Sequence, residues 1–238
     1  MLERSITLSI VSHRQNTLVN LFLDDLATLC VSDVQVILTE NVRDACALKA
    51  SGFAFPITVI QNAERKGFGA NHNAAFVHCT TPYYAVVNPD VRLPANPFPA
   101  LIDALRDGKN GVVGPLVRDP AGITQASAQR FPTPRSLVRK ALTGVEDQHE
   151  HNAGQVDWVA GMFMVFRSDA YRAVGGFDER YFLYYEDADI CRRLQRAGFG
   201  VMHQPAAAIV HDARRGSHRS ARLAAHHVAS MLRFLASS

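Results

Sequence analysis

The sequence predicts an α/β fold in which strands and helices alternate around a single sheet. Short apolar strands separated by helical segments are typical of this class, and the crossovers between its parallel strands are right-handed. The stretch VQVILT at 34–39 is apolar almost throughout, as expected for a strand that is buried on both faces. With 47% hydrophobic and 20% charged residues, the 238-residue chain can also bury a sizeable core.

The first part of the chain supplies most of the regular elements of that sheet. Apolar runs predict strands at 5–12, 34–39, 57–61, 83–87 and 111–117. The stretches between them predict helices at about 16–29, 42–50 and 97–106, and a helix of small residues after Gly67 and Gly69. Asn16 or Thr17 is expected to cap the first of these helices.

The second part of the chain is less regular. Residues 118–155 hold several prolines and basic residues, and such a long insertion is typical of a lid, a binding loop or a disordered segment. The remaining expected elements are a long apolar strand at 156–167, a helix at 169–174 capped by Ser168, a short edge strand at 198–202 and another strand at 207–210. The tail at 219–234 has an amphipathic pattern, which favours a helix docked on the core over contact with a membrane surface.

Charge, cysteine spacing and hydropathy exclude several classes of protein. The formal net charge of +3 is too small to indicate a nucleic-acid-binding protein. The four cysteines lie far apart without Cys-x-x-Cys pairing, which disfavours a zinc site or a disulfide framework and favours buried thiols in a reducing compartment. The first apolar run is too short for a signal sequence, and no stretch reaches the ~20 apolar residues of a membrane span. These observations predict a cytoplasmic protein.

Two strand ends carry residues that suit a ligand. Gly67 and Gly69 follow the third strand, where the backbone can approach a ligand closely, although the same glycines suit a tight turn before a packed helix. They lack the third glycine and the spacing of a dinucleotide fingerprint, which excludes a nicotinamide cofactor. Asp90 ends the fourth strand in Asn88-Pro89-Asp90, where a rigid carboxylate suits Mg²⁺ or Mn²⁺ or simply forms a turn.

The densest group of chemical features lies at 175–193. Paired glycines and an aromatic run precede three carboxylates, Glu186, Asp187 and Asp189, near the start of a helix expected at about 187–196. Acids at a helix start are favoured by the helix dipole, so this stretch can be an ordinary helix entry. The alternative is a general base held beside an aromatic platform.

Five motifs occur in order along the chain. They are Asn88-Pro89-Asp90, Trp158-Val159-Ala160-Gly161, Gly175-Gly176-Phe177-Asp178-Glu179, Tyr185-Glu186-Asp187-Ala188-Asp189, and His211 followed by Gly216-Ser217. In their order and spacing they resemble family 2 glycosyltransferases, and in particular the rhamnosyltransferase-like branch that builds bacterial surface polysaccharides. The resemblance covers residues 5 to 220, approximately, and is most specific in the second half of the chain.

This resemblance implies a GT-A fold, a single Rossmann-like mixed sheet flanked by helices. Residues 1–218 would form the glycosyltransferase domain, with a nucleotide half at about 1–117 and an acceptor half at about 118–218, and 219–238 would form a C-terminal amphipathic helix. The implied reaction is an inverting, hexosyltransferase-type transfer from a UDP- or dTDP-sugar, such as dTDP-rhamnose, to an acceptor hydroxyl. The implied acceptor is a growing surface polysaccharide or a lipid-linked glycan, which the protein would reach as a peripheral protein at the inner face of the membrane.

The resemblance also implies roles for individual residues. Asp90 and His211 are expected to hold a divalent cation, Mn²⁺ or Mg²⁺, that neutralises the leaving diphosphate. Asp187, with Glu186 as the alternative, is expected to take the proton of the acceptor hydroxyl. The implied nucleotide-sugar-binding residues are Ser12, His13, Glu40, Gly67, Gly69, Asn73, Asn88, Arg214, Arg215 and Ser217. The implied acceptor-binding residues are Trp158, Gly161, Tyr185 and Asp189.

The nucleotide half departs from the family pattern at two places. Glu40-Asn41-Val42 stands where the family usually has Asp-Asn-x-Ser, and Arg65-Lys66 replaces the asparagine of the glycine loop. These departures suit an alternative function, that of a non-catalytic nucleotide- or glycan-binding relative of the same fold. The retention of Asp90, Asp187 and His211 argues against that alternative. A nucleotidyltransferase is also disfavoured, because the first strand is not followed by a loop rich in glycine and basic residues. The oligomeric state stays open.

Overall fold

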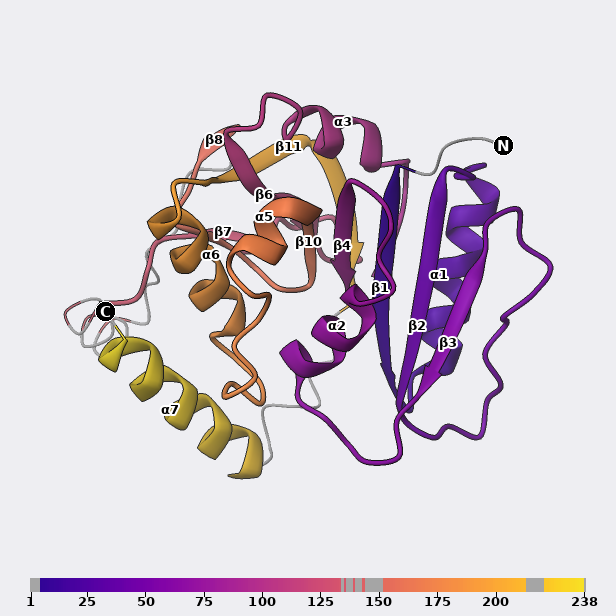
Figure 1. Cartoon of the computed structure of the whole chain (residues 1–238), viewed down its shortest axis with the longest axis horizontal. Helices are drawn as coiled ribbons and strands as arrows, with labels where there is room; N and C mark the ends of the chain where they lie inside the picture. The colour runs from indigo at the N-terminus through magenta and orange to yellow at the C-terminus, as the bar shows by residue number, and fades with distance from the viewer. Residues whose placement is uncertain are drawn as a thin grey trace.

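A mixed sheet with helices packed on both faces forms the computed structural model of the protein (Figure 1). The described residues are 5–133, 135, 139, 143, 152–212 and 221–237. The strands of the main sheet are β1 (Ile6–His13), β2 (Val34–Val42), β3 (Ile57–Gln61), β4 (Tyr83–Val87), β5 (Val91–Arg92), β6 (Asn110–Arg118), β8 (Gly154–Gln155), β10 (Phe163–Arg167) and β11 (Gly200–His211). A separate small sheet pairs β7 (Ala128–Gln129) with β9 (Trp158–Val159). The predicted α/β class is confirmed.

Strand direction divides the main sheet into two parts. The strand order is β3-β2-β1-β4-β10-β6-β11-β5, with β8 paired to β11. From β3 to β4 all neighbours are parallel, whereas β10 runs antiparallel to both β4 and β6. The carboxyl ends of β1, β2 and β4 therefore meet at one edge, which is where open α/β sheets bind ligands.

Two apolar layers hold the helices against the sheet. α1 (Asn16–Thr28) and α3 (Phe98–Asp103) pack on one face, whereas α2 (Phe68–Phe76), α5 (Ser168–Ala173) and α6 (Glu186–Arg196) pack on the other. Because successive strand side chains point to opposite faces, β4 contributes Ala85 and Val87 to the first core and Tyr84 and Val86 to the second. Each fully buried valine of this kind contributes about 1.5–3 kcal/mol to the hydrophobic stabilisation.

The helix predicted at 42–50 is wrong. β2 continues to Val42, and the residues after it form no helix because side chains of α1 bond to their backbone. Asn16 Nδ2 donates a hydrogen bond to the carbonyl of Cys46 at 2.7 Å, and Asp44 Oδ2 accepts the backbone N–H of Asn16 at 2.9 Å. The predicted cap of α1 is therefore wrong as well, because an aspartate from another segment satisfies the first turn of the helix.

The single long strand predicted at 156–167 is also wrong. The structure divides it into β9 of the small sheet and β10 of the main sheet. The break falls at Ala160 and Gly161, whose backbone N–H groups donate to the carbonyl of Ser127 and to Asp187 Oδ2, each at 2.9 Å. These bonds replace those of a strand ladder, so the chain leaves the sheet between β9 and β10.

β11 takes the place of the two strands predicted at 198–202 and 207–210. It is one strand in the interior of the sheet, parallel to β6 and antiparallel to β5. Its register with β6 shifts between Gln204 and Ala208, and Pro205 lies within that shift. Because proline has no N–H to donate to a strand ladder, it marks an irregularity inside one strand here.

Three local predictions also differ from the structure. Ser168 is the first residue of α5 and does not cap it, because its hydroxyl donates to the carbonyl of Thr81 at 2.7 Å. The helix expected at 97–106 ends at Asp103. Of the four free thiols, that of Cys191 is buried and that of Cys30 is exposed, so the expectation of buried cysteines is only partly met.

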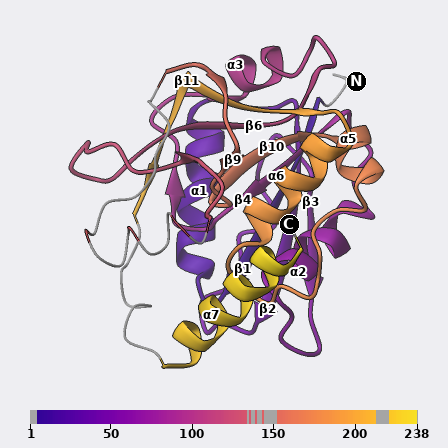
Figure 2. The same ribbon diagram turned by 90° about the vertical axis from the view of Figure 1, so that its left-hand side faces the viewer.

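The C-terminal helix α7 (Ala221–Ala236) docks on the core, as predicted, and lies beside α6 (Figure 1, Figure 2). Phe234 is buried, and Arg192 Nη1 of α6 donates to its carbonyl at 3.0 Å. Ser230 Oγ donates to the carbonyl of Leu183 at 2.9 Å. A cation near the last carbonyls of a helix also favours its dipole. Every helix among the described residues is too short or too polar to cross a bilayer.

Candidate active site

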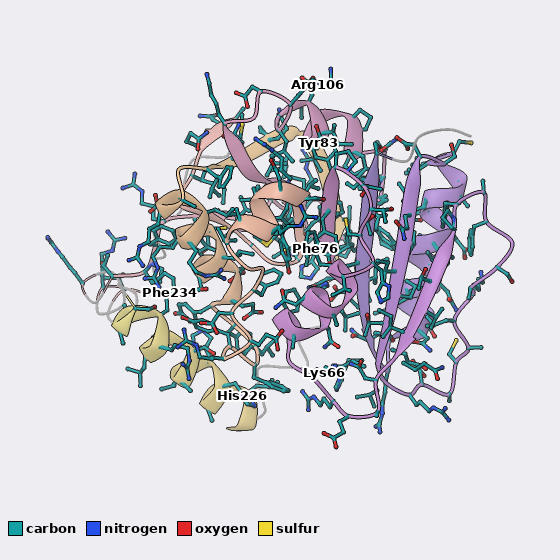
Figure 3. All side chains as sticks on the ribbon, viewed as in Figure 1. Lys66, Phe76, Tyr83, Arg106, His226 and Phe234 are labelled. Carbon is teal, nitrogen blue, oxygen red and sulfur yellow. The ribbon has the colours of Figure 1, made fainter. Side chains whose placement is uncertain are left out.

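A cleft of about 910 Å³ lies at the edge where β1, β2 and β4 end. Its walls come from segments far apart in the sequence, including these strand ends, the loop before α2, the start of α6 and the first half of α7. Figure 3 labels one residue from each of two walls, Lys66 of the loop before α2 and His226 of α7. Ligand pockets commonly measure about 300–1,000 Å³, so the cleft can enclose a small molecule.

One part of the cleft carries a carboxylate and an imidazole from two strand ends. Asp90 follows β4 and His211 ends β11, and their Oδ1 and Nε2 atoms lie 3.4 Å apart. The two segments are joined by backbone hydrogen bonding, because the N–H of Asp212 donates to the carbonyl of Asp90 at 3.1 Å. Both side chains are largely buried. The fold therefore brings together the two residues predicted to hold a metal ion.

The chemistry of this pair fits a divalent cation. Asp90 Oδ1 is buried and has no hydrogen-bond partner among the described residues. Carboxylate oxygens are the ligands that Mg²⁺ and Mn²⁺ prefer, and two neighbouring ligands of an octahedral Mg²⁺ ion lie about 3 Å apart. Within the described ranges, no third histidine, cysteine or acid joins the pair to complete a metal site. A cation held here would therefore complete its shell with phosphate oxygens and water.

A pair of acids stands at the start of α6. Glu186 is only 5% exposed, and its Oε2 atom has no hydrogen-bond partner in the part of the chain that the structure describes. Burial raises the pKa of Glu186 well above its ordinary value, and the neighbouring Asp187 raises it further. Glu186 therefore keeps its proton to a higher pH than an exposed glutamate does.

Asp187 is the member of the pair that the backbone stabilises as a carboxylate. Its Oδ2 accepts the N–H of Gly161 at 2.9 Å, and its Oδ1 accepts the N–H of Ala188 at 2.9 Å. Burial raises the pKa of Asp187 above its ordinary value, and these two hydrogen bonds offset part of that rise. The positive end of the α6 dipole acts in the same direction as the hydrogen bonds. Asp187 is therefore better suited than Glu186 to be an ionised base.

The backbone immediately before this pair is strained. Tyr184 and Tyr185 have φ angles of 72° and 64°, in the left-handed region that costs a residue with a side chain about 1–2 kcal/mol. The carbonyl of Phe182 accepts the N–H of Phe68 at 2.9 Å, which ties this turn to the start of α2. Such strain persists only where the surrounding structure enforces it, and here it turns the chain so that α6 begins at the cleft.

The predicted site residues fall into three groups. Those that line the cleft are His13, Asn88, Asp90, Trp158, Gly161, Tyr185, Glu186, Asp187 and His211. Those that do not line it are Ser12, Glu40, Gly67, Gly69, Asn73 and Asp189. Arg214, Arg215 and Ser217 lie outside the described residues.

Ser12 and Glu40 join strand ends to one another. The Ser12 hydroxyl donates to Asn16 Oδ1, and Glu40 Oε1 accepts Asn16 Nδ2 at 2.9 Å. The second oxygen of Glu40 accepts Gln61 Nε2 at 3.2 Å. Both predicted residues are largely buried, and their neighbouring residues His13 and Asn41 are the ones that line the cleft.

Gly67, Gly69 and Asn73 form part of the packing between α2 and the loop before α6. A Cβ atom on Gly67 would lie 2.8 Å from the carbonyl oxygen of Phe182, and one on Gly69 would lie 2.6 Å from the Cβ of Phe177. Asn73 donates to the carbonyl of Phe177 and accepts its N–H, both at 2.9 Å. The close approach that these glycines permit is thus between two protein segments.

Asp189 is held inside the protein by an ion pair. Its Oδ2 atom lies 2.7 Å from Arg193 Nε, one helical turn away. Arg193 also donates to the carbonyls of Val174 and Gly176, at 2.7 and 2.8 Å. Asp189 therefore supports the loop that leads to the Glu186–Asp187 pair, and the structure places it away from the cleft.

The sequence interpretation missed the contribution of α7 to the cleft. Leu223, His226 and His227 line it. His226 stacks on Phe182, with ring centroids 4.9 Å apart and ring planes at 21°, and the guanidinium of Arg65 lies 5.1 Å from the centroid of the same Phe182 ring. Leu223 and His227 belong to the amphipathic pattern at 219–234, so the sequence does indicate a helix with a buried face. Its position against the cleft depends on the tertiary fold.

Positive charge gathers where β1 ends and α2 begins. Arg65 and Lys66 are exposed and line the cleft together with His13. Partial burial lowers the pKa of His13, and the charge of Arg65 lowers it further. His72 also lines this part, and burial lowers its pKa to about 3, so it is neutral. The two positively charged side chains, Arg65 and Lys66, can attract a phosphate-bearing ligand to the cleft.

The arrangement of the sheet and its helices is the GT-A fold, which solved structures share. The mannosyltransferase PcManGT of Pyrobaculum calidifontis, in complex with GDP-Man and Mn²⁺, matches with a TM-score of 0.66 at 16% identity, over 99% of this chain and 65% of that one. GalNAc-T7 with UDP, GalNAc and Mn²⁺ matches with a TM-score of 0.68 at 13% identity, over 98% of this chain and 47% of that one. This chain thus spans less than two thirds of either structure.

The sequence belongs to glycosyltransferase-like family 2, whose family model matches residues 6–229. The N-acetylglucosaminyl-diphospho-decaprenol L-rhamnosyltransferase of Mycobacterium tuberculosis is 29% identical in an alignment of 245 positions that covers 90% of this chain and 78% of that protein. Rhamnosyltransferase WbbL of Escherichia coli K12 is 29% identical in an alignment of 161 positions that covers 62% of this chain and 61% of that protein. The predicted family and its rhamnosyltransferase-like branch are confirmed.

Proposed function

We propose that this protein transfers a sugar, with inversion at the anomeric carbon, from a nucleoside diphosphate sugar to a hydroxyl of a lipid-linked glycan. The observation that supports the proposal is that the Asp90–His211 pair and the Glu186–Asp187 pair line the same cleft. An inverting transfer needs two kinds of group, one that offsets the charge of the leaving diphosphate and one that takes the acceptor's proton. The two pairs are suited to these two tasks.

In the proposed step, Asp187 is the general base. The acceptor oxygen forms a bond to the anomeric carbon, while the bond from that carbon to the diphosphate oxygen breaks and its electron pair leaves with the diphosphate. The proton of the acceptor hydroxyl passes to the Asp187 carboxylate. Burial, and then the neighbouring Asp187, raise the pKa of Glu186 well above its ordinary value, which favours the negative charge of the pair on Asp187.

Asp90 and His211 would hold the divalent cation. Such an ion supplies Lewis-acid neutralisation of the diphosphate. Of the two candidate ions, Mn²⁺ is favoured because one of the two protein ligands is an imidazole nitrogen, and transition ions accept nitrogen more readily than Mg²⁺ does. Both solved structures described above were determined with Mn²⁺. Arg65 and Lys66 would add positive charge for the phosphates.

The names of the relatives guide the choice of donor and acceptor. They describe an L-rhamnosyltransferase that acts on N-acetylglucosaminyl-diphospho-decaprenol, and a second rhamnosyltransferase. We therefore take dTDP-rhamnose as the first donor to test, UDP-sugars as the second, and a lipid-linked N-acetylglucosamine diphosphate as the acceptor. Trp158 and Tyr185 offer flat apolar surfaces for an acceptor sugar. A lipid-linked acceptor would bring the protein to the membrane surface as a peripheral protein.

Release of the nucleoside diphosphate tests this function. The purified protein is incubated with dTDP-rhamnose, a UDP-sugar panel or GDP-mannose, together with Mn²⁺ and a short-chain lipid-diphosphate N-acetylglucosamine. We expect release with at least one donor, loss of release in EDTA, recovery with Mn²⁺, and an inverted anomeric configuration in the product by NMR. Failure to bind any nucleoside diphosphate would overturn the proposal, whereas binding without turnover would favour the non-catalytic relative.

A further inference from the structure

Gln125 makes two contacts with His211. Gln125 Oε1 lies 3.2 Å from His211 Nδ1, and Gln125 Nε2 donates to the backbone carbonyl of His211 at 3.4 Å. The second contact sets the orientation of the amide, because only its nitrogen can donate to a carbonyl. The amide oxygen therefore faces the imidazole ring.

This orientation determines where the imidazole carries its proton. An amide oxygen can only accept a hydrogen bond, so the Nδ1 atom beside it is the protonated nitrogen, and the Nε2 atom of a neutral His211 has a free electron pair. That Nε2 atom lies 3.4 Å from Asp90 Oδ1, which has no hydrogen-bond partner among the described residues. Two acceptor atoms thus face each other across this gap, an arrangement that a cation stabilises.

The other tautomer would remove one of the two ligands. With the proton on Nε2, that nitrogen would have no free electron pair beside Asp90 Oδ1, so it could not bind a cation. We propose that Gln125 is a positioning residue that holds His211 in the Nδ1-protonated form and so keeps His211 Nε2 and Asp90 Oδ1 available to a divalent cation. This inference rests on the proposed function, which makes this pair the cation site.

The fold holds Gln125 in place from its own segment. Its backbone N–H donates to the carbonyl of Val117 at the end of β6, at 2.8 Å. The preceding turn is closed by Asp119 Oδ1, which accepts the N–H of Ile123 at 2.8 Å. β6 is paired with β11, the strand that ends in His211. The first residues of the irregular 118–155 segment are thus built against the back of the proposed cation site.

Metal affinity tests the proposal with three variants. Gln125→Met keeps the length of the side chain and removes the acceptor, Gln125→Glu keeps an acceptor for Nδ1–H, and Ser127→Ala is the matched control. Ser127 lies in the same segment, and its hydroxyl donates to the carbonyl of Pro115 at 3.3 Å, away from His211. The Mn²⁺ dissociation constant is measured by EPR, for the protein alone and with dTDP or UDP. We expect Gln125→Met to raise it about 10- to 100-fold, and the other two variants to stay within about threefold of wild type.

The tautomer itself is measured without metal. Long-range ¹H–¹⁵N NMR distinguishes protonated from unprotonated imidazole nitrogens, and His211→Ala identifies the signals of this ring. We expect protonated Nδ1 in wild type and Gln125→Glu, and a shift toward protonated Nε2 in Gln125→Met. A merely structural role for Gln125 would leave the tautomer unchanged. A Gln125→Met protein with the wild-type tautomer and the wild-type Mn²⁺ affinity would overturn the inference.

Asp90→Ala and His211→Ala separate this inference from the proposed function. If neither substitution weakens Mn²⁺ binding, the proposed cation site is wrong and the role of Gln125 fails with it. If both weaken Mn²⁺ binding and Gln125→Met does not, the cation site stands and the role of Gln125 alone is wrong.

Discussion

The predicted residues of the nucleotide half and those of the metal and base sites use their polar atoms differently. In the nucleotide half, both carboxylate oxygens of Glu40 accept side-chain amides, and the Asn73 amide bonds to backbone and side chains. At the other two sites, Asp90 Oδ1 and Glu186 Oε2 are buried without hydrogen-bond partners among the described residues. Glu40 and Asn73 thus form a first group that holds the frame, and Asp90 and Glu186 form a second group with atoms left for a ligand.

This difference distinguishes residues whose polar atoms are used inside the protein from residues with a polar atom that remains available to a ligand. Leaving a buried polar atom without a partner costs about 1–3 kcal/mol, so folds retain few of them. Asp90 and Glu186 each carry such an atom at the wall of the cleft. Both atoms lie where the proposed reaction needs a cation ligand or a proton-bearing group. Substitutions in the two groups should accordingly change different quantities, catalysis in the second and stability in the first.

The largest effect is expected for Asp187→Asn. An amide keeps the size of the side chain and removes its basicity, so the turnover number should fall by about 10²- to 10⁴-fold. The dissociation constant for the nucleoside diphosphate should change little, because the acceptor's proton is not involved in that binding. Initial rates of diphosphate release and calorimetric titration measure the two quantities.

Glu186→Gln is the matched control for that experiment. Because burial raises the pKa of Glu186 well above its ordinary value, the protonated side chain is favoured, and an amide resembles that form. We expect a change of only a few-fold in the turnover number, on the order of one modest hydrogen bond. A loss in Glu186→Gln as large as that in Asp187→Asn would assign the base to Glu186 and break the distinction made between the two acids.

The next largest effect is a loss of stability in Asn73→Ala. The substitution removes the bonds of Asn73 to both backbone groups of Phe177, to the hydroxyl of Tyr171 at 2.7 Å and to Glu179 Oε1 at 3.0 Å. We expect the free energy of unfolding to fall by about 3 kcal/mol, because most of these bonds are buried or partly buried. Urea denaturation followed by circular dichroism measures it.

Glu179→Ala is the control for Asn73, since it removes only the exposed one of these bonds. It should lower the free energy of unfolding by no more than about 0.5 kcal/mol. If Asn73→Ala leaves stability unchanged and instead weakens binding of the nucleoside diphosphate, Asn73 belongs to the ligand site after all. The comparison between the two groups of residues would then fail at this position.

A pH dependence of stability should follow from Glu186. Burial, and then Asp187, raise its pKa in the folded state above the ordinary value of 4.5. A raised pKa means that the folded state binds the proton more tightly, so this contribution is fully present below pH 4.5 and is lost as the pH rises through the folded-state pKa. The free energy of unfolding of wild type should therefore fall relative to that of Glu186→Gln as the pH rises. Denaturation at a series of pH values measures this difference, and a constant difference would contradict it.

Local patterns in the sequence were sufficient for the strands at 34–39, 57–61 and 83–87 and for the positions of Asp90, Glu186 and Asp187. The apolar run at 34–39 predicts a buried strand without reference to any other segment. Asp90 follows the strand at 83–87 in the sequence, so its place at a strand end is also predicted locally. The acids at the start of α6 are likewise identified by position. Each of these predictions depends on a few consecutive residues, and the structure places the elements where they are expected.

The predictions that failed depend on hydrogen bonds between distant segments. The expected helix at 42–50 is replaced because Asn16 bonds to the carbonyl of Cys46. The expected strand at 156–167 is broken where Gly161 donates to Asp187, 26 residues further on. Gln125 shows no motif of its own, and only its contact with His211 reveals it. Such contacts have no periodicity in sequence, so pattern analysis does not detect them.

The smallest of these effects is expected at α7. This helix forms a wall of the cleft that contains none of the five sequence motifs. His226 lines the cleft and stacks on Phe182 in the turn before the Glu186–Asp187 pair. An aromatic pair contributes about 0.5–1.5 kcal/mol beyond the area that it buries, which corresponds to about a 2- to 10-fold change in an equilibrium constant. His226→Ala should raise the Michaelis constant for the acceptor by this factor, with the donor constant nearly unchanged.

The control for His226 is Val228→Ala, because Val228 is 50% exposed on α7 and does not line the cleft. Steady-state kinetics with the acceptor and donor varied separately distinguish the outcomes. An equal effect of both substitutions would mean that α7 acts only through its own stability. An effect of His226→Ala on the donor constant alone would place this wall with the nucleotide half, because Phe182 also contacts Arg65 of that half.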